Sequence, residues 1–471
     1  MRTSDAVHYK NKKVWEEIVA TNVTDIIERA RFGPYQILIL VMCGIMIFFD
    51  GYDLLSISFT APEFIKLLGI DRSMIGPVFS AGLFGLTIGA LAFGLMADRI
   101  GPSRTFLICC VAFGALTLLT AFASSLTELL VVRFLAGLAL GGASPISVAI
   151  ASNYCPKRIR TTVVMIMYIS IAVGQIAAGY TYAYLATFGW KTMFYVGGAL
   201  PIALAPLFYL LLPEPVEFLV MKGASRQRIA SILARIDPAG SFDAGTEFVV
   251  AADNKVGFQV YQLFQDGRAA LTSVLWVVFF TSIMAIYFYN NWIPTLLHGS
   301  GLSQGEIVTI TTALPFGGVI GTLLIAPLLL KLGSFRTVAL GYLCAAIAMV
   351  VLASIGLSFL ALALCVFAVG FFLIGTQSAL NASSALIYPP SLRATGVGWG
   401  FGVGRIGSII SPSIAGVLVA LSFQPTQLFL IAAVPTLAAG ITAYVLMRML
   451  GSASATPVSS LGDVNAAAPV R

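Results

Sequence analysis

Charged side chains are scarce in this sequence. Only 10% of its 471 residues are Asp, Glu, Lys or Arg, whereas 58% are hydrophobic. Soluble globular domains carry about 25% charged residues, so a fold of this composition could not cover its surface with groups that water solvates. The shortage of charge excludes a water-soluble globular protein and indicates a chain whose surface faces lipid.

Residues that hold metals or perform catalysis are also nearly missing. The sequence has two histidines, His8 and His298, both outside its long apolar runs, and its six cysteines form no CxxC pair or metal-ligand spacing with histidine. Neither a Ser/His/Asp nor a Cys/His arrangement falls in or near an apolar run, and no glycine-rich loop leads into Lys and Ser or Thr as in a nucleotide-binding loop. We therefore expect no metal site, no cofactor and no enzymatic activity, and ATP-driven transport is disfavoured.

Long apolar runs are abundant instead. A helix needs about 20 apolar residues to cross a bilayer, and runs of this kind recur twelve times. They lie at 36–58, 76–97, 105–123, 128–151, 161–184, 192–212, 270–293, 306–329, 337–355, 360–388, 395–421 and 427–448. Period-two alternation is never sustained, as membrane-spanning strands would require. The pattern predicts an all-α polytopic membrane protein with twelve transmembrane helices.

Basic residues are distributed unequally between the loops. With the N-terminus placed inside, the cytoplasmic segments hold 22 Lys and Arg, whereas the opposite face holds three: Lys66, Arg72 and Lys191. Cytoplasmic loops of membrane proteins are enriched in these residues, so both termini are expected in the cytoplasm. The net charge of +7 is then a topological signal, and we expect no nucleic-acid partner.

The chain divides into two halves that resemble each other. The loop 94–104 matches 326–336 at an offset of 232, and the loop 156–162 matches 389–395 at an offset of 233. Two loops in the same order at nearly one offset indicate duplication. Some transporter folds consist of such parallel repeats, with the substrate site between the halves near mid-membrane. The sequence therefore predicts two six-helix pseudo-repeats.

The regions outside the helical runs complete the expected organisation. Residues 13–30 carry apolar residues among charges, which fits either an amphipathic helix on the inner surface or a solvated arm. The expected segments are a cytoplasmic arm (1–35), a first bundle (36–212), a cytoplasmic loop (213–269), a second bundle (270–448) and a disordered cytoplasmic tail (449–471).

Several motifs together resemble one known family. The loop Gly94–Gly101 fits the G-x-x-x-D-R-x-G motif of the major facilitator superfamily. Within it the chain is similar to the aromatic acid/proton symporters, through DGYD at 50–53, FSAGLFG at 79–85, WKTMFYVGGALP from Trp190, and the segment 375–408. The chain departs from the pattern at Pro102 and Ser103, where basic residues are usual, and at Leu330, the counterpart of Asp98.

This resemblance implies a major facilitator fold and a proton-coupled importer of small aromatic carboxylates, of the benzoate or hydroxybenzoate type. It implies a monomer in the bacterial inner membrane whose partners are the aromatic anion, protons and the lipid bilayer. A carrier or exporter of another organic anion in the same fold is the first alternative. A membrane receptor without net transport is the second, and it is disfavoured because the chain carries no signalling domain.

Two acidic residues and one arginine are the candidates for proton coupling. Asp50 and Asp53 are the only acids deep within an apolar run, where a charge costs at least roughly 2.5–3.5 kcal/mol on insertion scales. Their spacing of three places them on one helix face, where each carboxylate makes the other easier to protonate. A buried structural pair satisfied by Arg or by backbone donors is the alternative. Arg133 in the fourth run either takes part in coupling, as the resemblance implies, or neutralises an Asp.

Substrate binding is assigned to five polar residues inside the runs. Arg405 is the other intramembrane cation, and its counterpart at an offset of 233 is Ala172, so the repeat does not require it. An arginine binds a carboxylate bidentately, and a structural ion pair is the alternative. Gln175, Gln377 and Asn381 are further candidates, and for them interhelical hydrogen bonding without a substrate is an equal alternative.

Tyr287 is the fifth residue of this set and belongs to an aromatic cluster with Phe288, Tyr289 and Trp292. Such a cluster near the end of a run is first interpreted as an interfacial belt. Stacking on an aromatic substrate is the alternative, and Tyr287 is its best candidate. Separately, Asp98, Arg99 and Arg104 in the first repeated loop are expected to form a cytoplasmic salt-bridge latch, with a purely topological loop as the alternative.

Overall fold

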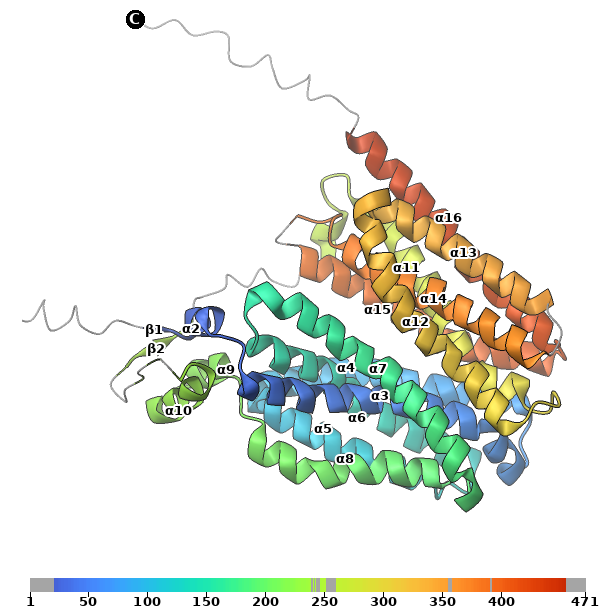
Figure 1. Ribbon diagram of the computed structural model, residues 1–471, viewed down its shortest axis with the longest axis horizontal. Coiled ribbons are helices and arrows are strands. Elements are labelled where there is room, and N and C mark those ends of the chain that lie inside the picture. Colours follow the sequence, from blue (N-terminus) through green and yellow to red (C-terminus); the bar gives the residue numbers. More distant parts are fainter. Residues whose placement is uncertain are drawn as a thin grey trace, which may run out of the picture. The chain divides into compact units, whose positions relative to one another are not determined.

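The computed structural model describes residues 21–238, 240, 242, 246–250, 260–354, 358–389 and 392–454. Within them, twelve helices are long and apolar enough to cross a membrane, which confirms the all-α polytopic prediction (Figure 1). The first six are α3 (Pro34–Leu68), α4 (Ile75–Ile100), α5 (Pro102–Thr120), α6 (Leu126–Asn153), α7 (Lys157–Leu185) and α8 (Thr192–Leu211). The second six are α11 (Ala269–Leu297), α12 (Gln304–Leu332), α13 (Ser334–Ser354), α14 (Phe359–Ser384), α15 (Arg393–Ala420) and α16 (Pro425–Ser454).

The duplicated loops each turn at a glycine with positive φ. Gly101 separates α4 from α5 with φ of 110°, and Gly333 separates α12 from α13 with φ of 89°. Only glycine adopts positive φ without steric strain. The two glycines are 232 residues apart, so the offset seen in the sequence corresponds to one backbone requirement met twice.

Helix packing repeats at the same offset. A Cβ added at Gly85 of α4 would collide with the carbonyl oxygen of Phe134 on α6, and one at Gly317 of α12 would collide with that of Phe367 on α14. The same holds one turn further on, for Gly89 against Leu138 and Gly321 against Phe371. Glycine lets transmembrane helices approach until their backbones touch. The duplication seen in the sequence therefore corresponds to the same glycine contacts between helices in both halves of the chain.

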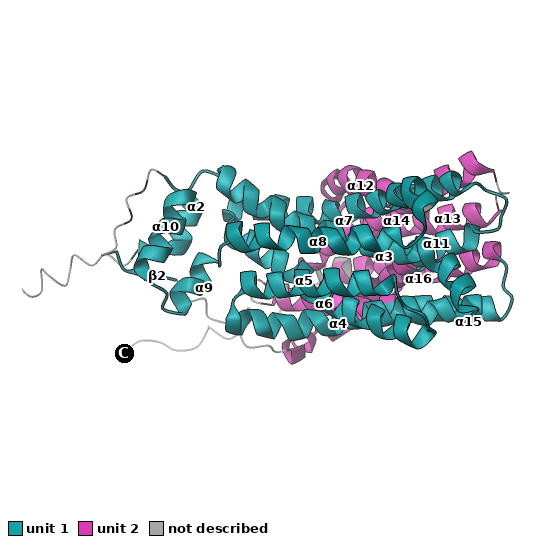
Figure 2. Ribbon diagram, turned by 90° about the horizontal axis from the view of Figure 1, so that it is seen from below, with its two compact units in different colours: residues 1–255, 288–315, 409–424 teal, residues 256–287, 316–408, 425–471 magenta. Residues whose placement is uncertain are grey.

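The chain forms two compact units, coloured separately in Figure 2. Unit 1 holds residues 1–255 together with 288–315 and 409–424, and unit 2 holds 256–287, 316–408 and 425–471. Unit 1 thus includes the end of α11, the beginning of α12 and the end of α15. In it the Ser80 hydroxyl of α4 donates to the Ile409 carbonyl at 2.6 Å and lies 2.7 Å from the Ser413 hydroxyl.

The N-terminal arm and the central loop fold together at one end of the first six helices (Figures 1 and 2). Their elements are β1 (Thr21–Asn22), α2 (Val23–Arg29), α9 (Val216–Met221), α10 (Arg226–Ile236) and β2 (Phe248–Val249), whereas η3 (Val260–Phe264) belongs to unit 2 and precedes α11. Strands β1 and β2 pair in parallel. Val23, Ile27, Leu233 and Phe248 are buried in the same apolar cluster as Ile39 of α3. The described part of the arm is therefore packed and not solvated.

One expected boundary changes, at the C-terminal end of the last helix. The arm residues 1–20, including the first half of the proposed amphipathic segment, lie outside the described residues. At the other end, α16 continues to Ser454, so residues 449–454 are helical where a disordered tail was expected. The last apolar turn simply extends through small Ser and Ala residues that tolerate a helix. Residues 455–471 lie outside the described residues.

We expect Gly85→Ala to destabilise the protein, because its methyl group would overlap the backbone of Phe134. Overpacking of this kind costs about 1–3 kcal/mol and should lower the melting temperature in detergent. The matched control is Gly94→Ala on the same helix, where a Cβ would meet nothing within 4 Å. Equal melting temperatures for the two variants would contradict the glycine contact.

Candidate functional site

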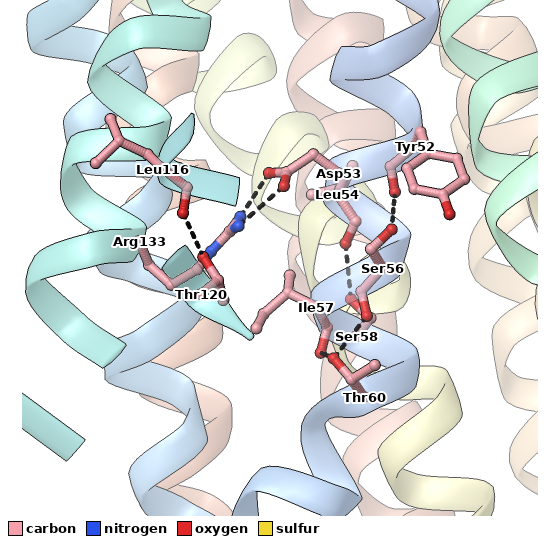
Figure 3. Close-up of polar contacts among 10 residues, drawn as sticks. All are labelled: Tyr52, Asp53, Leu54, Ser56, Ile57, Ser58, Thr60, Leu116, Thr120 and Arg133. Carbon is pink, nitrogen blue, oxygen red and sulfur yellow. Dashed lines mark hydrogen bonds and ion pairs between the residues drawn. The ribbon is translucent and has the colours of Figure 1, made fainter. Parts of the chain in front are cut away.

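A buried ion pair in unit 1 joins α3 to α6. Arg133 donates to both carboxylate oxygens of Asp53, Nη1 to Oδ1 at 2.9 Å and Nη2 to Oδ2 at 2.5 Å (Figure 3). The two residues are 4% and 5% exposed. Such a bidentate pair fixes geometry as well as charge. Removing either member would leave a buried charge without its partner, which costs about 3–5 kcal/mol.

A second contact lies beside the first. Ser144, eleven residues after Arg133 on α6, donates from its hydroxyl to Oδ2 of Asp50 at 2.8 Å. Eleven residues make about three helical turns, so Arg133 and Ser144 share one face of α6. Asp50 and Asp53 likewise share one face of α3. Each predicted acid therefore has a donor on α6, and Asp50 is the more exposed of the two.

Other hydroxyls on α3 do not belong to this pair. Ser56, Ser58 and Thr60 donate to the carbonyls of Tyr52, Leu54 and Ser56 on their own helix (Figure 3). Ser and Thr commonly satisfy themselves this way inside helices. Helix α3 is also held against α7, because a Cβ at Gly51 would collide with the Ile171 carbonyl. The acids thus project from a helix whose position is fixed on two sides.

In unit 2, the structure brings Arg405 and Tyr287 together. The Arg405 guanidinium donates from Nη1 to the Tyr287 hydroxyl at 3.1 Å, from α15 to α11. Both residues are half-buried. Gly407 lies so close to α11 that an added Cβ would reach the Phe280 carbonyl. The glycine-rich sequence around Arg405 therefore sets the distance at which the guanidinium meets the phenol.

The other two candidates of unit 2 lie in one hydrogen-bond chain. The Tyr342 hydroxyl of α13 donates to Gln377 Oε1 at 2.9 Å, and Gln377 Nε2 donates to Asn381 Oδ1 at 3.2 Å. Tyr342 is fully buried, Gln377 is buried and Asn381 is half-buried. Tyr342 was not among the expected site residues, because a tyrosine in an apolar run gives no sign of its partner.

Gln175 has a different neighbour. Its amide Nε2 donates to Asn290 Oδ1 at 3.1 Å, and both side chains are buried in unit 1. The remaining four substrate-binding candidates belong to unit 2. Asn290 was also overlooked, although it is one of two adjacent asparagines within an apolar run, and that position is a signal for a buried polar contact.

The aromatic cluster at the end of α11 is not an interfacial belt. Phe288 is 6% exposed, and Tyr289 and Trp292 are fully buried. The Trp292 ring meets Phe79 of α4 edge-on, with centroids 6.0 Å apart. The belt interpretation is wrong because these three rings are buried within unit 1, where they cannot face lipid headgroups.

The expected latch residues form no ion pair with any described residue in this structure. Asp98, Arg99 and Arg104 are exposed. The buried residue beside them is Glu214, whose carboxylate accepts from the backbone N–H groups of Ser103 at 3.0 Å and Arg104 at 3.1 Å. Burial raises the pKa of the Glu214 carboxyl, and these N–H groups oppose that rise.

Glu214 thus caps the N-terminus of α5, where unpaired N–H groups attract an acceptor. Ser103, one of the departures from the family pattern, adds a hydrogen bond from its hydroxyl to the Pro213 carbonyl at 2.7 Å. Glu214 stands between two prolines just after a span and was not among the expected site residues. Its position after α8 was the available signal.

Comparison with known proteins places this arrangement in a family. The chain is 37% identical over 422 residues to a gallate transporter of Pseudomonas putida, covering 89% of this chain and 94% of the relative. It is 34% identical over 426 residues to a 4-hydroxybenzoate transporter of Acinetobacter baylyi, covering 89% and 93%. Both relatives are transporters and not enzymes.

The fold has solved counterparts. A crystal structure of a D-xylose-proton symporter aligns with a TM-score of 0.68 at 18% identity, covering 87% of this chain and 97% of that one. At that identity the likeness concerns the fold alone. The sequence model described as Major Facilitator Superfamily matches residues 41–399 and 275–463. With a match over most of its length, the chain belongs to the major facilitator superfamily.

Proposed function

We propose that this protein imports small aromatic carboxylates together with protons across the bacterial inner membrane, with both termini in the cytoplasm. The observation that carries the proposal is the contact between Arg405 and Tyr287 inside two apolar helices. It supplies a cation and an aromatic ring at one place, as an aromatic anion requires. The names of the two relatives, a gallate and a 4-hydroxybenzoate transporter, support the same substrate class.

The guanidinium of Arg405 is the proposed carboxylate receptor. Its planar fork can hold two carboxylate oxygens, and the low dielectric inside a membrane protein strengthens that contact. The Tyr287 hydroxyl orients the guanidinium by accepting a hydrogen bond from its Nη1 at 3.1 Å. The phenol ring of Tyr287 then lies beside the bound carboxylate, where it can contact the ring of the substrate.

The acids on α3 are the proposed proton carriers. Protonating Asp53 would remove the charge that Arg133 pairs with, and a guanidinium left buried without a counter-charge is unfavourable. Proton uptake at this pair is therefore tied to a rearrangement of Arg133. Asp50, held by the neutral Ser144 hydroxyl and more exposed, provides the second carboxyl through which the proton is passed.

Alternating access then requires contacts that break on each side. With both termini in the cytoplasm, the hydrogen bonds of Ser80 to α15 and of Gln175 to Asn290 lie toward the outer ends of their helices. These bonds connect the outer ends of α15 and α11 to α4 and α7 within unit 1. They must open to admit substrate from outside. The exposed Asp98, Arg99 and Arg104 are proposed to pair when the cytoplasmic side closes.

Uptake by cells expressing the protein tests the proposed function. Radiolabelled benzoate and its hydroxylated derivatives should accumulate saturably, and a protonophore should abolish accumulation because no other energy source is coupled. Accumulation that resists the protonophore would contradict proton coupling. Binding without accumulation would favour the receptor alternative and overturn transport.

Arg405→Ala should weaken the apparent affinity for the aromatic anion by tenfold or more, because hydrogen bonds to a charged group contribute about 1.5–3 kcal/mol. Arg405→Lys should also weaken it, since it keeps the charge but loses the planar fork. Tyr287→Phe is the milder companion variant, because it removes only the acceptor at 3.1 Å from Arg405. The measurement is the concentration for half-maximal uptake. An unchanged value for inserted Arg405→Ala protein rules out this role.

Asp53→Asn should uncouple transport from protons. Asparagine resembles the protonated side chain in shape but cannot release a proton, so the variant should still exchange labelled for unlabelled substrate while failing to accumulate it. Both assays are run in the same vesicles, and Asp50→Asn is tested in parallel. Asp71→Asn serves as the control, because Asp71 is an exposed acid that caps a short helix outside the spans. Full protonophore-sensitive accumulation by both span variants would show that the proton travels elsewhere.

A further inference from the structure

The three basic residues expected on the outer face differ in their surroundings. Lys66 is exposed, and Lys191 lies over the rings of Phe122 and Trp190, with its Nζ 5.7 Å from each centroid. Arg72 is half-buried, with its Nη2 buried, and its guanidinium makes no hydrogen bond or ion pair to any residue that the structure describes. Burying a charged donor without a partner is unfavourable, so the contacts of the fold alone do not account for Arg72.

The acid next to Arg72 in the sequence is already engaged. Asp71 caps η1 (Arg72–Met74), because its Oδ1 accepts from the Ser73 N–H at 2.8 Å and from the Ser73 hydroxyl at 2.6 Å. Asp71 is exposed, whereas Nη2 of Arg72 is buried. The neighbouring carboxylate therefore does not neutralise the guanidinium in this structure.

Arg72 begins the segment that packs against the outer end of α15. A Cβ added at Gly416 would collide with the carbonyl oxygen of Ser73, and one added at Gly76 would collide with that of Pro412. We call these two contacts the outer seam, and all of their residues belong to unit 1. Like the hydrogen bonds between α4 and α15, the outer seam must open under the proposed function to admit substrate.

The face of α15 in the outer seam also carries the proposed carboxylate receptor. Pro412 and Gly416 follow Arg405 by seven and eleven residues, which is about two and three helical turns. Helix α15 is continuous through this stretch. The seam residues of α15 therefore share a face with Arg405, and Gly416 lies about 16 Å further along the helix axis. Opening of the seam would uncover a face that runs from the neighbourhood of Arg72 to Arg405.

We propose that Arg72 is an outer receptor for the substrate, which pairs with the carboxylate of the aromatic anion when the outer seam opens and before the anion reaches Arg405. This assignment rests on the proposed function and adds a binding residue to it. The guanidinium has no counter-charge while the seam is closed. An anion that enters the open seam supplies one, and an ion pair formed away from bulk water is stronger than one in water.

Half-saturating concentrations measured from each side of the membrane test this proposal. The substrate is the acid that wild-type protein accumulates best among benzoate and its hydroxylated derivatives. Arg72→Gln should raise the value for substrate added outside by about fivefold, less than Arg405→Ala does, because water screens a half-buried charge. In inside-out vesicles the value for the cytoplasmic side should not change. Arg72→Lys should stay within about twofold of wild type, since attraction requires the charge and not the planar fork.

The matched control is Lys66→Gln. It removes the same charge from an exposed position at the outer end of α3, and it should leave both values unchanged. Raising the ionic strength of the outer solution should raise the outside value for wild-type protein more than for Arg72→Gln, because salt screens the attraction. Each protein is assayed in vesicles with and without phosphatidylglycerol, since a lipid phosphate is the other anion available to Arg72.

The outcomes separate the two proposals. An unchanged outside value for Arg72→Gln, an equal rise on both sides of the membrane, or an equal rise for Lys66→Gln would each overturn the role of Arg72 and leave aromatic acid transport intact. A rise confined to vesicles with phosphatidylglycerol would assign the guanidinium to lipid phosphate and would overturn the role as well. Wild-type protein that transports none of these acids would overturn the proposed function itself.

Discussion

A buried ion pair constrains this protein more than any other single contact. The bilayer core offers no water to solvate a charge, so Asp53 and Arg133 are each tolerable only because the other is present at hydrogen-bonding distance. The pair fixes the register of α3 against α6, and Ser144 with Asp50 repeats that register three turns along α6. The rest of unit 1 is arranged so that this register is kept: α3 touches α7 backbone to backbone at Gly51, and α4 touches α6 at Gly85.

The two halves share their packing but not their chemistry. Gly85 and Gly317 serve the same helix contact, and Gly101 and Gly333 the same turn. At the offset of 233 found for the second pair of loops, however, Arg133 corresponds to Val366 and Arg405 to Ala172. Duplication therefore explains the scaffold, whereas each intramembrane cation belongs to one half alone. That asymmetry is what lets one half handle a proton and the other an anion, as proposed.

Sequence reasoning located the helices, the repeat and the charged residues because each has a strong one-dimensional signal. Apolar run length determines a span, and a charge within such a run stands out. Partner choice has no comparable signal. Asp50 receives its hydrogen bond from Ser144, but a serine in a span usually donates to its own helix, as Ser56 does. A serine that donates to another helix differs from one that donates to its own helix only in the direction its helix face points. For α6 that direction is set by the glycine contacts with α4.

The burial and the contacts of loop residues were harder to predict for a related reason. Glu214 was not among the expected site residues, yet it is buried as the cap of α5. The arm and central loop each contain too few apolar residues to predict a fold, and they become ordered by packing together, with β1 pairing to β2 across more than 200 residues of sequence. Contacts between segments so distant are invisible to local patterns, whereas spans are local by nature.

The two helices that carry the proposed anion site, α11 and α15, are each divided between the two compact units. Helix α11 belongs to unit 2 up to Tyr287 and to unit 1 from Phe288, and α15 belongs to unit 2 up to Ser408 and to unit 1 from Ile409. Arg405 and Tyr287 thus sit at the ends of the two unit 2 segments, directly before the residues that pack in unit 1. A ligand can shift a conformational equilibrium only through contacts that differ between states. Under the proposed function, the anion acts on α11 and α15 through Tyr287 and Arg405, and the proton acts on α3 and α6 through Asp53 and Arg133. Coupled transport of the two requires that each changes the binding of the other by the same factor, because linkage between two ligands is reciprocal.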